Sequence, residues 1–569
     1  MDNASVAKAL HTIAVLLEIK GDNPFKIRSY ANAAQLIGNM GEPVAVLFQE
    51  ARLRTVEGIG EALEKKIGEL ITTGEIAYLN ELLHSYPNTI LDLLKVEGLG
   101  PKSVKILYET LGIGSLKELR QACLDGKIAQ IAGFTKNKEE KFLESLDFIE
   151  EQQQGRFRLN NVWMAAAMLR ARLLEHSPAV NVEVAGSLRR FDNLVKDANL
   201  IASSTDAVSV MKCFLSAPEV EQVVAAGRMK SAIIFKGGIP VELRVVTPPQ
   251  FPFALLHFTG SKAHNVLLRN RASERGLELN EYGLFKIDGS PLVCNDEAAI
   301  YAALGLPFLP PEVREGILEF GLTSPSNLVQ RQDMQGLVHC HSSWSDGMNS
   351  LQEMANAARQ MGYQYLVVTD HSQASAYVNG LTPERVKQQH AEIDEINDLD
   401  LSGFRILKGI ESDILPDGSL DYGMDVLRTF EFIIASVHSN LDMTEKEATR
   451  RIIRAIENPF TSAIGHLTGR LLLTRRGYKV DVEKVVDAAV ANGVAFEINA
   501  NPRRLDMDWH HLRRAADKGM RFVIGPDAHS ISGLNNVRYG IGVARKGALT
   551  PEHILNCLPV EKFLQWRKS

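Results

Sequence analysis

The sequence predicts a multidomain chain of the α/β class, with a helical first part, a mixed α+β middle part and a C-terminal barrel of alternating strands and helices. Its 569 residues are too many for one hydrophobic core and suggest about three or four domains. Residues 5–150 show short amphipathic helical stretches separated by glycines. From residue 336 onward, seven apolar strand candidates alternate with helical segments, which predicts a parallel sheet long enough to close into a barrel.

Composition excludes several classes of protein. Hydrophobic residues make up 45% of the chain and charged residues 23%, which are ordinary globular values and exclude a disordered chain or a fibre. The longest apolar runs fall far short of the ~20 residues that a membrane span needs, and the N-terminus shows no signal-peptide pattern. Five isolated cysteines without a CxxC pair indicate a reduced, cytoplasmic protein without disulfides or thiolate zinc sites.

The helical part contains an internal repeat. Val56-Glu57-Gly58-Ile59-Gly60 precedes the predicted helix 61–70, and Val96-Glu97-Gly98-Leu99-Gly100 precedes the predicted helix 101–111. A degenerate third copy at 131–135 opens a helix near 138–146. A Gly-apolar-Gly turn before a helix exposes backbone N–H groups at the positive helix end, where they cradle a phosphate without side-chain charge. We therefore expect Gly58, Gly60, Gly98 and Gly100 to bind DNA, although residues 1–150 carry 17 basic against 21 acidic residues.

The middle part has a mixed pattern. A helix is predicted at 162–174, followed by strands at 180–185, 198–202, 231–235 and 241–246 and by a helical, turn-rich portion that ends near 311. The polar stretch 323–335 is the best linker candidate.

The barrel strands nearly all end in residues that bind metals. Ten of the fifteen histidines lie after residue 335. In an H-x-H sequence at a strand end, both imidazoles share one side because side chains at i and i+2 share a face. Ligands from the C-terminal ends of parallel strands meet at one rim, where barrel enzymes build their sites. The pattern predicts a multinuclear site, and its mixed His and carboxylate ligands suit Zn²⁺, Mn²⁺ or Fe²⁺. The nine candidate ligands are His339, His341, Asp346, His371, Glu411, His438, His466, Asp527 and His529.

These motifs resemble the PHP (polymerase and histidinol phosphatase) domain over residues 333–569. The resemblance implies a distorted (βα)7 PHP barrel with three divalent metals. One metal would be held by His339, His341, Glu411 and Asp527. The second would be held by Glu411, His438 and His466, with Glu411 bridging, and the third by Asp346, His371 and His529. Arg503 is a further candidate for phosphate contact.

The middle and first parts resemble the family X DNA polymerases. The motifs are Gly186-Ser187-Leu188-Arg189-Arg190, Asp197-x-Asn199, Val241-Glu242-Leu243-Arg244 and Phe258-Thr259-Gly260-Ser261-Lys262, and residues 23–30 resemble the family's lyase-type domain. By this resemblance, Ser187 and Arg190 would contact the incoming triphosphate, Phe258 and Gly260 would line the sugar pocket, and Asn265 and Arg269 would face the nascent base pair. Lys66 falls at the position of the family's Schiff-base lysine; a solvated helix lysine is the alternative interpretation.

The chain departs from the family at its catalytic metal positions. The resemblance implies two Mg²⁺ on three aspartates, but this sequence has Asp197, Asn199 and Glu242. Asn199 is neutral, and Glu242 is one methylene longer than aspartate, which suits the strict octahedral geometry of Mg²⁺ poorly. Lys196 also replaces a glycine. We therefore expect poor Mg²⁺ or Mn²⁺ binding in the palm and a degraded nucleotidyl-transfer site.

The whole sequence is similar to bacterial and archaeal family X polymerases that carry a PHP domain and act in base-excision repair. The expected domains are an N-terminal lyase-like domain (1–85), a fingers-like domain (86–150), a palm (151–250), a thumb (251–320), a linker (321–334) and the PHP domain (335–569). The predicted function is DNA repair by a metal-dependent 3′–5′ exonuclease or 3′-end-processing activity, with weak or lost gap-filling synthesis.

The expected partners are gapped, nicked or 3′-ended DNA and a dNTP, and we expect a monomer. Three alternatives remain open from the sequence. They are an active gap-filling polymerase with a PHP nuclease, a non-catalytic DNA-end scaffold, and a small-molecule phosphatase of the histidinol-phosphatase type.

Overall fold

The computed structural model describes residues 3–566 except residues 39, 41–43, 57, 154, 318–326 and 401. Its contacts divide the chain into two compact units, Met1–Gln154 and Gly155–Ser569. The first residues of the predicted linker (321–326) and Glu57 of the first Gly-apolar-Gly turn lie outside the described residues. None of the described helices is both long and apolar enough to cross a membrane.

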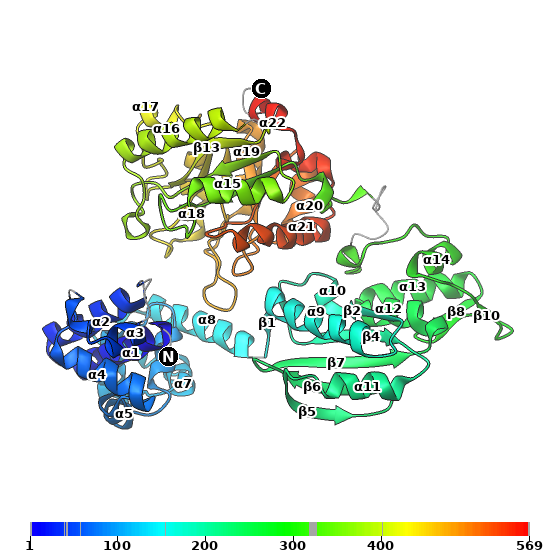
Figure 1. Ribbon diagram of the computed structural model, residues 1–569, viewed down its shortest axis with the longest axis horizontal. Coiled ribbons are helices and arrows are strands. Elements are labelled where there is room, and N and C mark those ends of the chain that lie inside the picture. Colours follow the sequence, from blue (N-terminus) through cyan, green and yellow to red (C-terminus); the bar gives the residue numbers. More distant parts are fainter. Residues whose placement is uncertain are drawn as a thin grey trace. The chain divides into compact units, whose positions relative to one another are not determined.

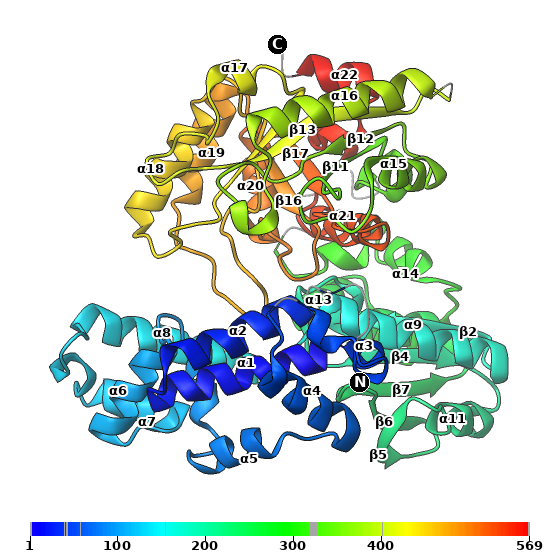
Figure 2. The same cartoon turned by 60° about the vertical axis from the view of Figure 1, so that its left-hand side comes forward.

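The first unit is helical. Helices α1 and α2 lie side by side (Figure 2) and enclose a core of aliphatic side chains with the helices that follow. The structure ends helices α4 and α6 at the left-handed residues Gly74 and Gly112, which glycine adopts without strain. The helices are α1 (Asn3–Lys20), α2 (Pro24–Gly38), α3 (Val44–Gln49), α4 (Glu61–Thr73), α5 (Ala77–His84), α6 (Pro101–Leu111), α7 (Leu116–Leu124) and α8 (Lys136–Gln153).

The second unit begins with a five-stranded sheet in the order β2-β4-β7-β6-β5, in which only β4 and β7 run parallel. Helices α9 and α11 pack on this sheet. Strand β5 was not predicted, because its side chains from Glu221 to Ala226 are exposed and give no apolar alternation. The elements are β1 (Phe157–Arg158), α9 (Leu159–His176), β2 (Asn181–Ala185), α10 (Gly186–Arg189), β3 (Leu194–Val195), β4 (Ala198–Ser203), α11 (Ala207–Leu215), β5 (Val220–Ala226), β6 (Lys230–Phe235) and β7 (Ile239–Val246).

Residues 251–303 form a smaller subdomain. The prediction of a helical and turn-rich portion is incomplete here, since an antiparallel sheet of three short strands follows two helices. Short strands with turn residues between them give a weak periodic signal. The elements are α12 (Phe251–Thr259), α13 (Lys262–Glu274), β8 (Leu277–Asn280), β9 (Gly283–Lys286), β10 (Pro291–Leu292) and α14 (Glu297–Ala303).

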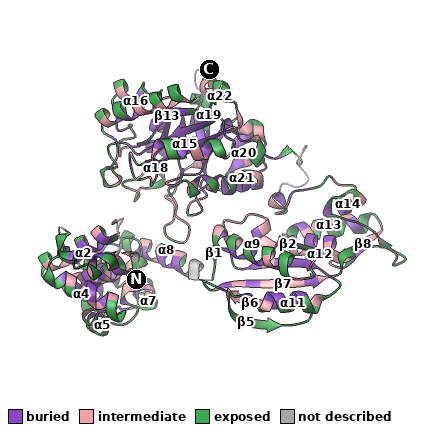
Figure 3. Ribbon diagram, in the orientation of Figure 1, coloured by how far each residue is buried: buried purple, intermediate pink, exposed green. Residues whose placement is uncertain are grey.

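From residue 336 the chain forms a barrel of seven parallel strands in sequence order. The strands are buried on both faces and the helices present exposed residues to the outside (Figures 1 and 3). The strands are β11 (Gly336–Cys340), β12 (Tyr365–Val368), β13 (Arg405–Asp413), β14 (Phe432–Ser436), β15 (Ala463–Ile464), β16 (Ala495–Asn499) and β17 (Phe522–Gly525). The helices are α15 (Leu351–Gln360), α16 (Pro383–Leu399), α17 (Met424–Leu427), α18 (Glu445–Ile456), α19 (Val482–Asn492), α20 (Trp509–Asp517), α21 (Val537–Lys546) and α22 (Val560–Trp566).

The barrel closes through a short seam between its first and last strands. Cys340 forms an isolated parallel bridge with Ala528, just beyond β17. Ala528 accepts a backbone hydrogen bond from the His341 amide (2.8 Å) and donates one to the carbonyl of His339 (3.3 Å). The seam therefore brings the first and last groups of candidate ligands together.

Candidate metal centre and nucleic-acid-binding sites

The carboxylate of Glu411 lies at the centre of the candidate metal ligands. It is 1% exposed, and five imidazoles face it from the ends of four strands. Its Oε2 lies 3.4 Å from His339 Nε2, 3.7 Å from His341 Nε2 and 3.1 Å from His371 Nδ1. Its Oε1 lies 3.2 Å from His438 Nε2 and 3.0 Å from His466 Nε2. The two oxygens thus face different imidazoles, the arrangement that a bridging carboxylate needs.

The other carboxylates complete a continuous cluster. Asp527 Oδ1 lies 3.7 Å from His339 Nε2 and 3.5 Å from His341 Nε2. Asp346 lies 3.4 Å from His529 Nε2 and 3.8 Å from His371 Nε2. The structure therefore brings all nine predicted ligands together, but the grouping of close ligand atoms differs from the expected one. Three sets emerge: His341, Asp346, His371 and His529; His339, His341 and Asp527; and His371, Glu411 and His438. His466 contacts Glu411 outside these sets.

Electrostatics keep the central carboxylates ionised. Burial opposes the charge of Glu411, but the imidazoles of His339, His438 and His371 hold its pKa well below its usual range. Burial and the neighbouring His529 and His371 lower the pKa of His341 to about 3, and burial with Arg504 lowers that of His466 to about 3. Those two imidazoles are therefore neutral near pH 7, which is the form that binds metals.

The donor set fits divalent metal ions. Within the described part of the chain, His339 Nε2, both ring nitrogens of His341, His371 Nδ1 and His466 Nδ1 are buried without a hydrogen-bond partner. An orphaned buried polar atom costs free energy comparable to a lost hydrogen bond, so a group of them needs a ligand. Mixed imidazole and carboxylate donors suit Mn²⁺, Zn²⁺ or Fe²⁺.

Buried carboxylates hold the ligands in place. Asp413 accepts hydrogen bonds from His438 Nδ1 (2.5 Å) and Ser375 Oγ (2.7 Å). Glu497 accepts one from His339 Nδ1 and one from the His466 amide (2.7 Å). Sequence reasoning gave Asp413 no role, although its i+2 spacing from Glu411 places both side chains on one face of β13. Such partners fix the orientation of the ligand imidazoles.

Two further anchors were also missed. Asp370 accepts hydrogen bonds from the backbone and side chain of Ser342 and from Ser345 Oγ (2.8, 2.6 and 2.5 Å), which holds the turn that leads to Asp346. Arg504 Nε lies 3.2 Å from Asp527 Oδ2. Arg504 therefore contacts the cluster, whereas a phosphate contact of its neighbour Arg503 stays a prediction.

The backbone is strained at the cluster. His339 and Asp527 adopt left-handed φ angles of 67° and 50°, which residues with a Cβ seldom do. A Cβ at Gly525 would lie 2.1 Å from Glu497 Oε1, so only glycine permits the close approach of β17 to Glu497. Strain and close packing of this kind are typical of functional sites.

The palm positions lie together at the start of β4 and on β7. Asn199 pairs with Glu242 in the parallel register, and Asn199 Nδ2 donates to Asp197 Oδ1 at 2.9 Å. Burial and the neighbouring Glu242 raise the pKa of Asp197. Glu242 forms ion pairs with Lys230 (2.7 Å) and Arg244 (3.0 Å). Two cations thus already neutralise its carboxylate.

Most of the predicted nucleotide-binding residues share one pocket. A hollow of about 440 Å³ is lined by Arg190, His257, Phe258, Thr259, Gly260, Ser261, Lys262, Asn265 and Arg269. Ser187 lies on α10 and is not among the lining residues. Arg244 stacks on the Phe258 ring with its guanidinium carbon 4.3 Å from the ring centre. The pocket combines an aromatic surface with three cationic side chains.

The two Gly-apolar-Gly turns have the predicted shape. Gly58 and Gly98 adopt left-handed φ angles of 96° and 81°, and Gly60 and Gly100 are the N-cap residues of α4 and α6. The glycines are exposed, and a Cβ at Gly60 or Gly100 would meet no atom within 4 Å among the described residues. Both helix N-termini are therefore open to a phosphate.

Lys66, the lyase candidate, lies on α4 of the same unit. Its Nζ is 3.4 Å from Glu69 Oε2 and lies over the ring of Tyr78, 5.4 Å from the ring centre. An ion-paired ammonium is a poor nucleophile until that pair is broken.

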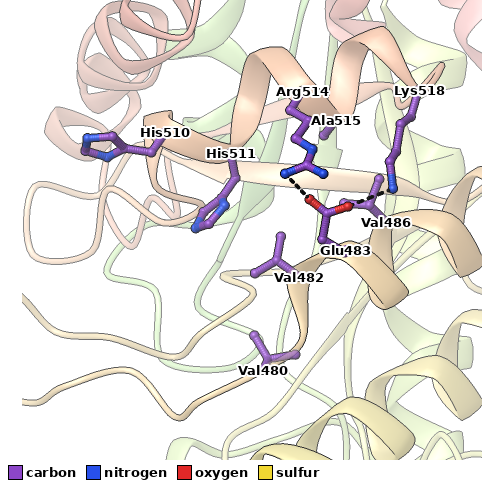
Figure 4. A pocket seen from close by; sticks show the side chains of 9 residues that line it. All are labelled: Val480, Val482, Glu483, Val486, His510, His511, Arg514, Ala515 and Lys518. Carbon is purple, nitrogen blue, oxygen red and sulfur yellow. Dashed lines mark hydrogen bonds and ion pairs between the residues drawn. The ribbon is translucent and has the colours of Figure 1, made fainter. Parts of the chain in front are cut away.

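A further hollow of about 330 Å³ lies between α19 and α20 on the outside of the barrel (Figure 4). Its central carboxylate, Glu483, forms ion pairs with Arg514 (2.7 Å) and Lys518 (3.1 Å). None of the nine candidate ligands lines it. Its charged groups satisfy one another, so it does not extend the metal centre.

Comparison with known proteins places four family matches along the chain. They are a helix-hairpin-helix domain (residues 1–76), a SAM-like helix-hairpin-helix tandem (90–147), a DNA polymerase beta thumb (254–315) and a PHP domain (338–501). The chain is 38% identical, over 99% of its length and all of the relative's, to the "DNA polymerase/3'-5' exonuclease PolX" of Bacillus subtilis.

Two other relatives match parts of the chain. A "Probable phosphatase" of Acetivibrio thermocellus is 32% identical over 34% of this chain and 78% of its own. The human "DNA-directed DNA/RNA polymerase mu" is 25% identical over 55% of this chain and 69% of its own. The helix-hairpin-helix repeats, the polymerase thumb and the metal-binding barrel together define a DNA-binding repair enzyme. The chain belongs to the family X DNA polymerases that carry a C-terminal PHP domain.

The first prediction concerns the two turns. Replacing Gly60 and Gly100 with valine should weaken binding of a gapped duplex at least about tenfold, uniformly across DNA sequences, because the side chains would block phosphate approach. Both glycines have φ near −87°, so valine leaves the backbone unstrained. Fluorescence anisotropy at fixed salt measures the affinity. Thr73→Val, at the other end of α4, is the matched control. Unchanged affinity in the double variant would remove the turns from the DNA-binding surface.

The second prediction concerns Asp413. Asp413→Asn should lower the affinity for Mn²⁺ about 10- to 100-fold, because His438 loses the anionic acceptor that orients it. Equilibrium dialysis measures bound metal per chain. Ser375→Ala removes the other hydrogen bond to Asp413 and should have a much smaller effect. Equal losses in both variants would show that Asp413 does not act through His438.

Proposed function

We propose that the barrel is a divalent-metal-dependent 3′–5′ exonuclease or 3′-end-processing phosphoesterase acting on DNA, and that nucleotide addition by the palm is weak or lost. The observation that supports this is the complete set of nine ligands around Glu411. Divalent metals bound there would polarise phosphoryl oxygens and lower the pKa of water. Mn²⁺, Zn²⁺ and Fe²⁺ are the candidate metals.

The residues around the metals would position the substrate. Arg504 carries a positive charge to the edge of the cluster, beside Asp527. The exposed turns at Gly60 and Gly100 supply phosphate contacts for gapped, nicked or 3′-ended DNA. Both features favour a nucleic-acid substrate over a small phosphate ester, and so count against a histidinol-phosphatase type of activity.

The palm supports nucleotide binding better than nucleotide addition. Its pocket keeps Arg190, Phe258 and Arg269. Asn199 offers no charge to a metal, and the ion pairs of Glu242 with Lys230 and Arg244 compete with metal binding. Phosphoryl transfer needs cations that hold the attacking oxygen and the triphosphate in line, so we expect a dNTP to bind without efficient transfer.

An active gap-filling polymerase is the second candidate. It is favoured by the full-length match to a relative whose name includes polymerase and by the retained pocket. A non-catalytic scaffold would not account for the buried imidazole nitrogens of the barrel that lack a hydrogen-bond partner.

The third prediction tests the barrel. His339→Ala with His341→Ala should abolish Mn²⁺-dependent shortening of a 5′-labelled single strand or gapped duplex, because two ligands facing Glu411 are lost. A chelator should do the same to the unmodified protein. His390→Ala, at a half-buried histidine on α16 outside the ligand set, is the control and should retain activity. Persistent shortening by the double variant would contradict the site assignment.

The fourth prediction tests the palm, in the His339→Ala/His341→Ala background so that shortening cannot hide extension. The unmodified palm should show little primer extension with Mg²⁺ and dNTPs. Asn199→Asp together with Glu242→Asp should raise extension at least about tenfold, since one missing carboxylate is restored and the other is shortened by the methylene that Mg²⁺ geometry tolerates poorly. Each single substitution is the matched control. Robust extension without the substitutions would show that Asp197 and Glu242 suffice.

A further inference from the structure

A buried ion cluster joins helix α21 of the barrel to the turn after α10. Lys546, the last residue of α21, is fully buried. Its ammonium donates to the backbone carbonyl of Arg190 (2.9 Å) and forms ion pairs with Asp192 (2.9 Å) and Glu315. A buried ammonium is stable only when its donors are satisfied, and here both carboxylates and the carbonyl come from residues 190–315.

The same carboxylate also holds Arg190. Glu315 Oε1 lies 3.0 Å from Arg190 Nε, Nη1 of Arg190 donates to the carbonyl of Thr259 at 2.6 Å, and Nη2 lies 3.5 Å from Asp192 Oδ2. Arg190 lines the nucleotide pocket and is the residue proposed above to meet the triphosphate. Its guanidinium is therefore occupied by protein groups in this structure.

We propose that Glu315 competes with the phosphates of a nucleoside triphosphate for Arg190, and that Lys546 of the barrel sets the strength of this competition. The proposal rests on the nucleotide pocket described under the proposed function. One oxygen of Glu315 is shared between two cations. Without Lys546, Glu315 would pair with Arg190 alone. The Glu315–Arg190 ion pair, which a nucleotide must break, would then be stronger. Neutralising Glu315 would free Arg190.

Helix α21 connects the Glu315–Arg190 contact to the candidate metal centre. The helix begins eight residues after the candidate ligand His529, and its Gly540 packs against Ile524 of β17. At Gly542 an added Cβ would lie 2.0 Å from the Phe191 ring, so α21 and the turn after α10 are in close contact. A nucleotide that takes Arg190 away from Glu315 should therefore leave Glu315 to Lys546 alone and hold α21 more firmly, because coupling between two sites is reciprocal.

The test measures the affinity of the intact protein for 2′-deoxyadenosine 5′-(α,β-imido)triphosphate with Mg²⁺ by calorimetry. Glu315→Gln should tighten binding about tenfold, and Lys546→Met should weaken it several-fold. Asp192→Asn is the matched control, because it makes the same charge change in the same cluster. Asp192 lies 3.5 Å from Arg190, farther than Glu315, so this variant should change the affinity for the analogue less than threefold. Hydrogen exchange of residues 537–546 should slow when the analogue binds the unmodified protein, but not when it binds Lys546→Met.

Glu315→Asp separates competition from a general field effect, since it keeps the charge while drawing the carboxylate back from Arg190. It should also tighten binding, and it serves if Glu315→Gln does not fold. Equal effects of Glu315→Gln and Asp192→Asn, or an unchanged affinity in both Glu315 variants, would overturn the competition. Failure of the unmodified protein and of every variant to bind the analogue would instead overturn the nucleotide pocket of the proposed function.

Discussion

The barrel depends on one buried negative charge. A carboxylate that is 1% exposed carries a large desolvation cost, and the imidazoles of His339, His438 and His371 offset that cost for the Glu411 anion. To bring those rings to one point, the ends of four separate strands must keep their register around β13, which carries Glu411. This convergence strains the backbone locally, since His339 and Asp527 have left-handed φ angles. It also requires the close approach of β17 to Glu497 at Gly525.

The two phosphate-chemistry sites of the chain handle charge in opposite ways. In the barrel, the carboxylates face imidazoles, whose ring nitrogens bind divalent ions once they are deprotonated. In the palm, the carboxylate of Glu242 is already satisfied by Lys230 and Arg244, and an amide occupies the position beside it. Within the described residues, the palm keeps a pocket lined by Arg190, Phe258 and Arg269, while the barrel holds the buried imidazole nitrogens without hydrogen-bond partners.

Periodicity and strand-end residues predicted the barrel well, because the strands are short and apolar and six of the seven carry a candidate ligand at or near their C-terminal end. All seven predicted strands are present, and the nine ligands lie together as predicted. Asp413 and Glu497 were harder to assign because a carboxylate that orients a ligand has the same sequence signature as one that binds a metal. Strand β5 was missed because its exposed residues give no alternation. The contacts of Lys546 could not be predicted at all, because a lysine at a helix end ordinarily points to solvent and its partners lie more than 200 residues away.

Two of the candidate ligands lie on either side of the seam between β11 and β17. A few backbone hydrogen bonds around Cys340 and Ala528 close the barrel, and His339 and Asp527 face each other across the same gap. A metal ion bound by both residues would join the first and last strands of a domain more than 200 residues long. Because binding to the folded state alone stabilises it, the supply of metal in the cell would govern how long the barrel resists proteolysis, as well as how fast it acts.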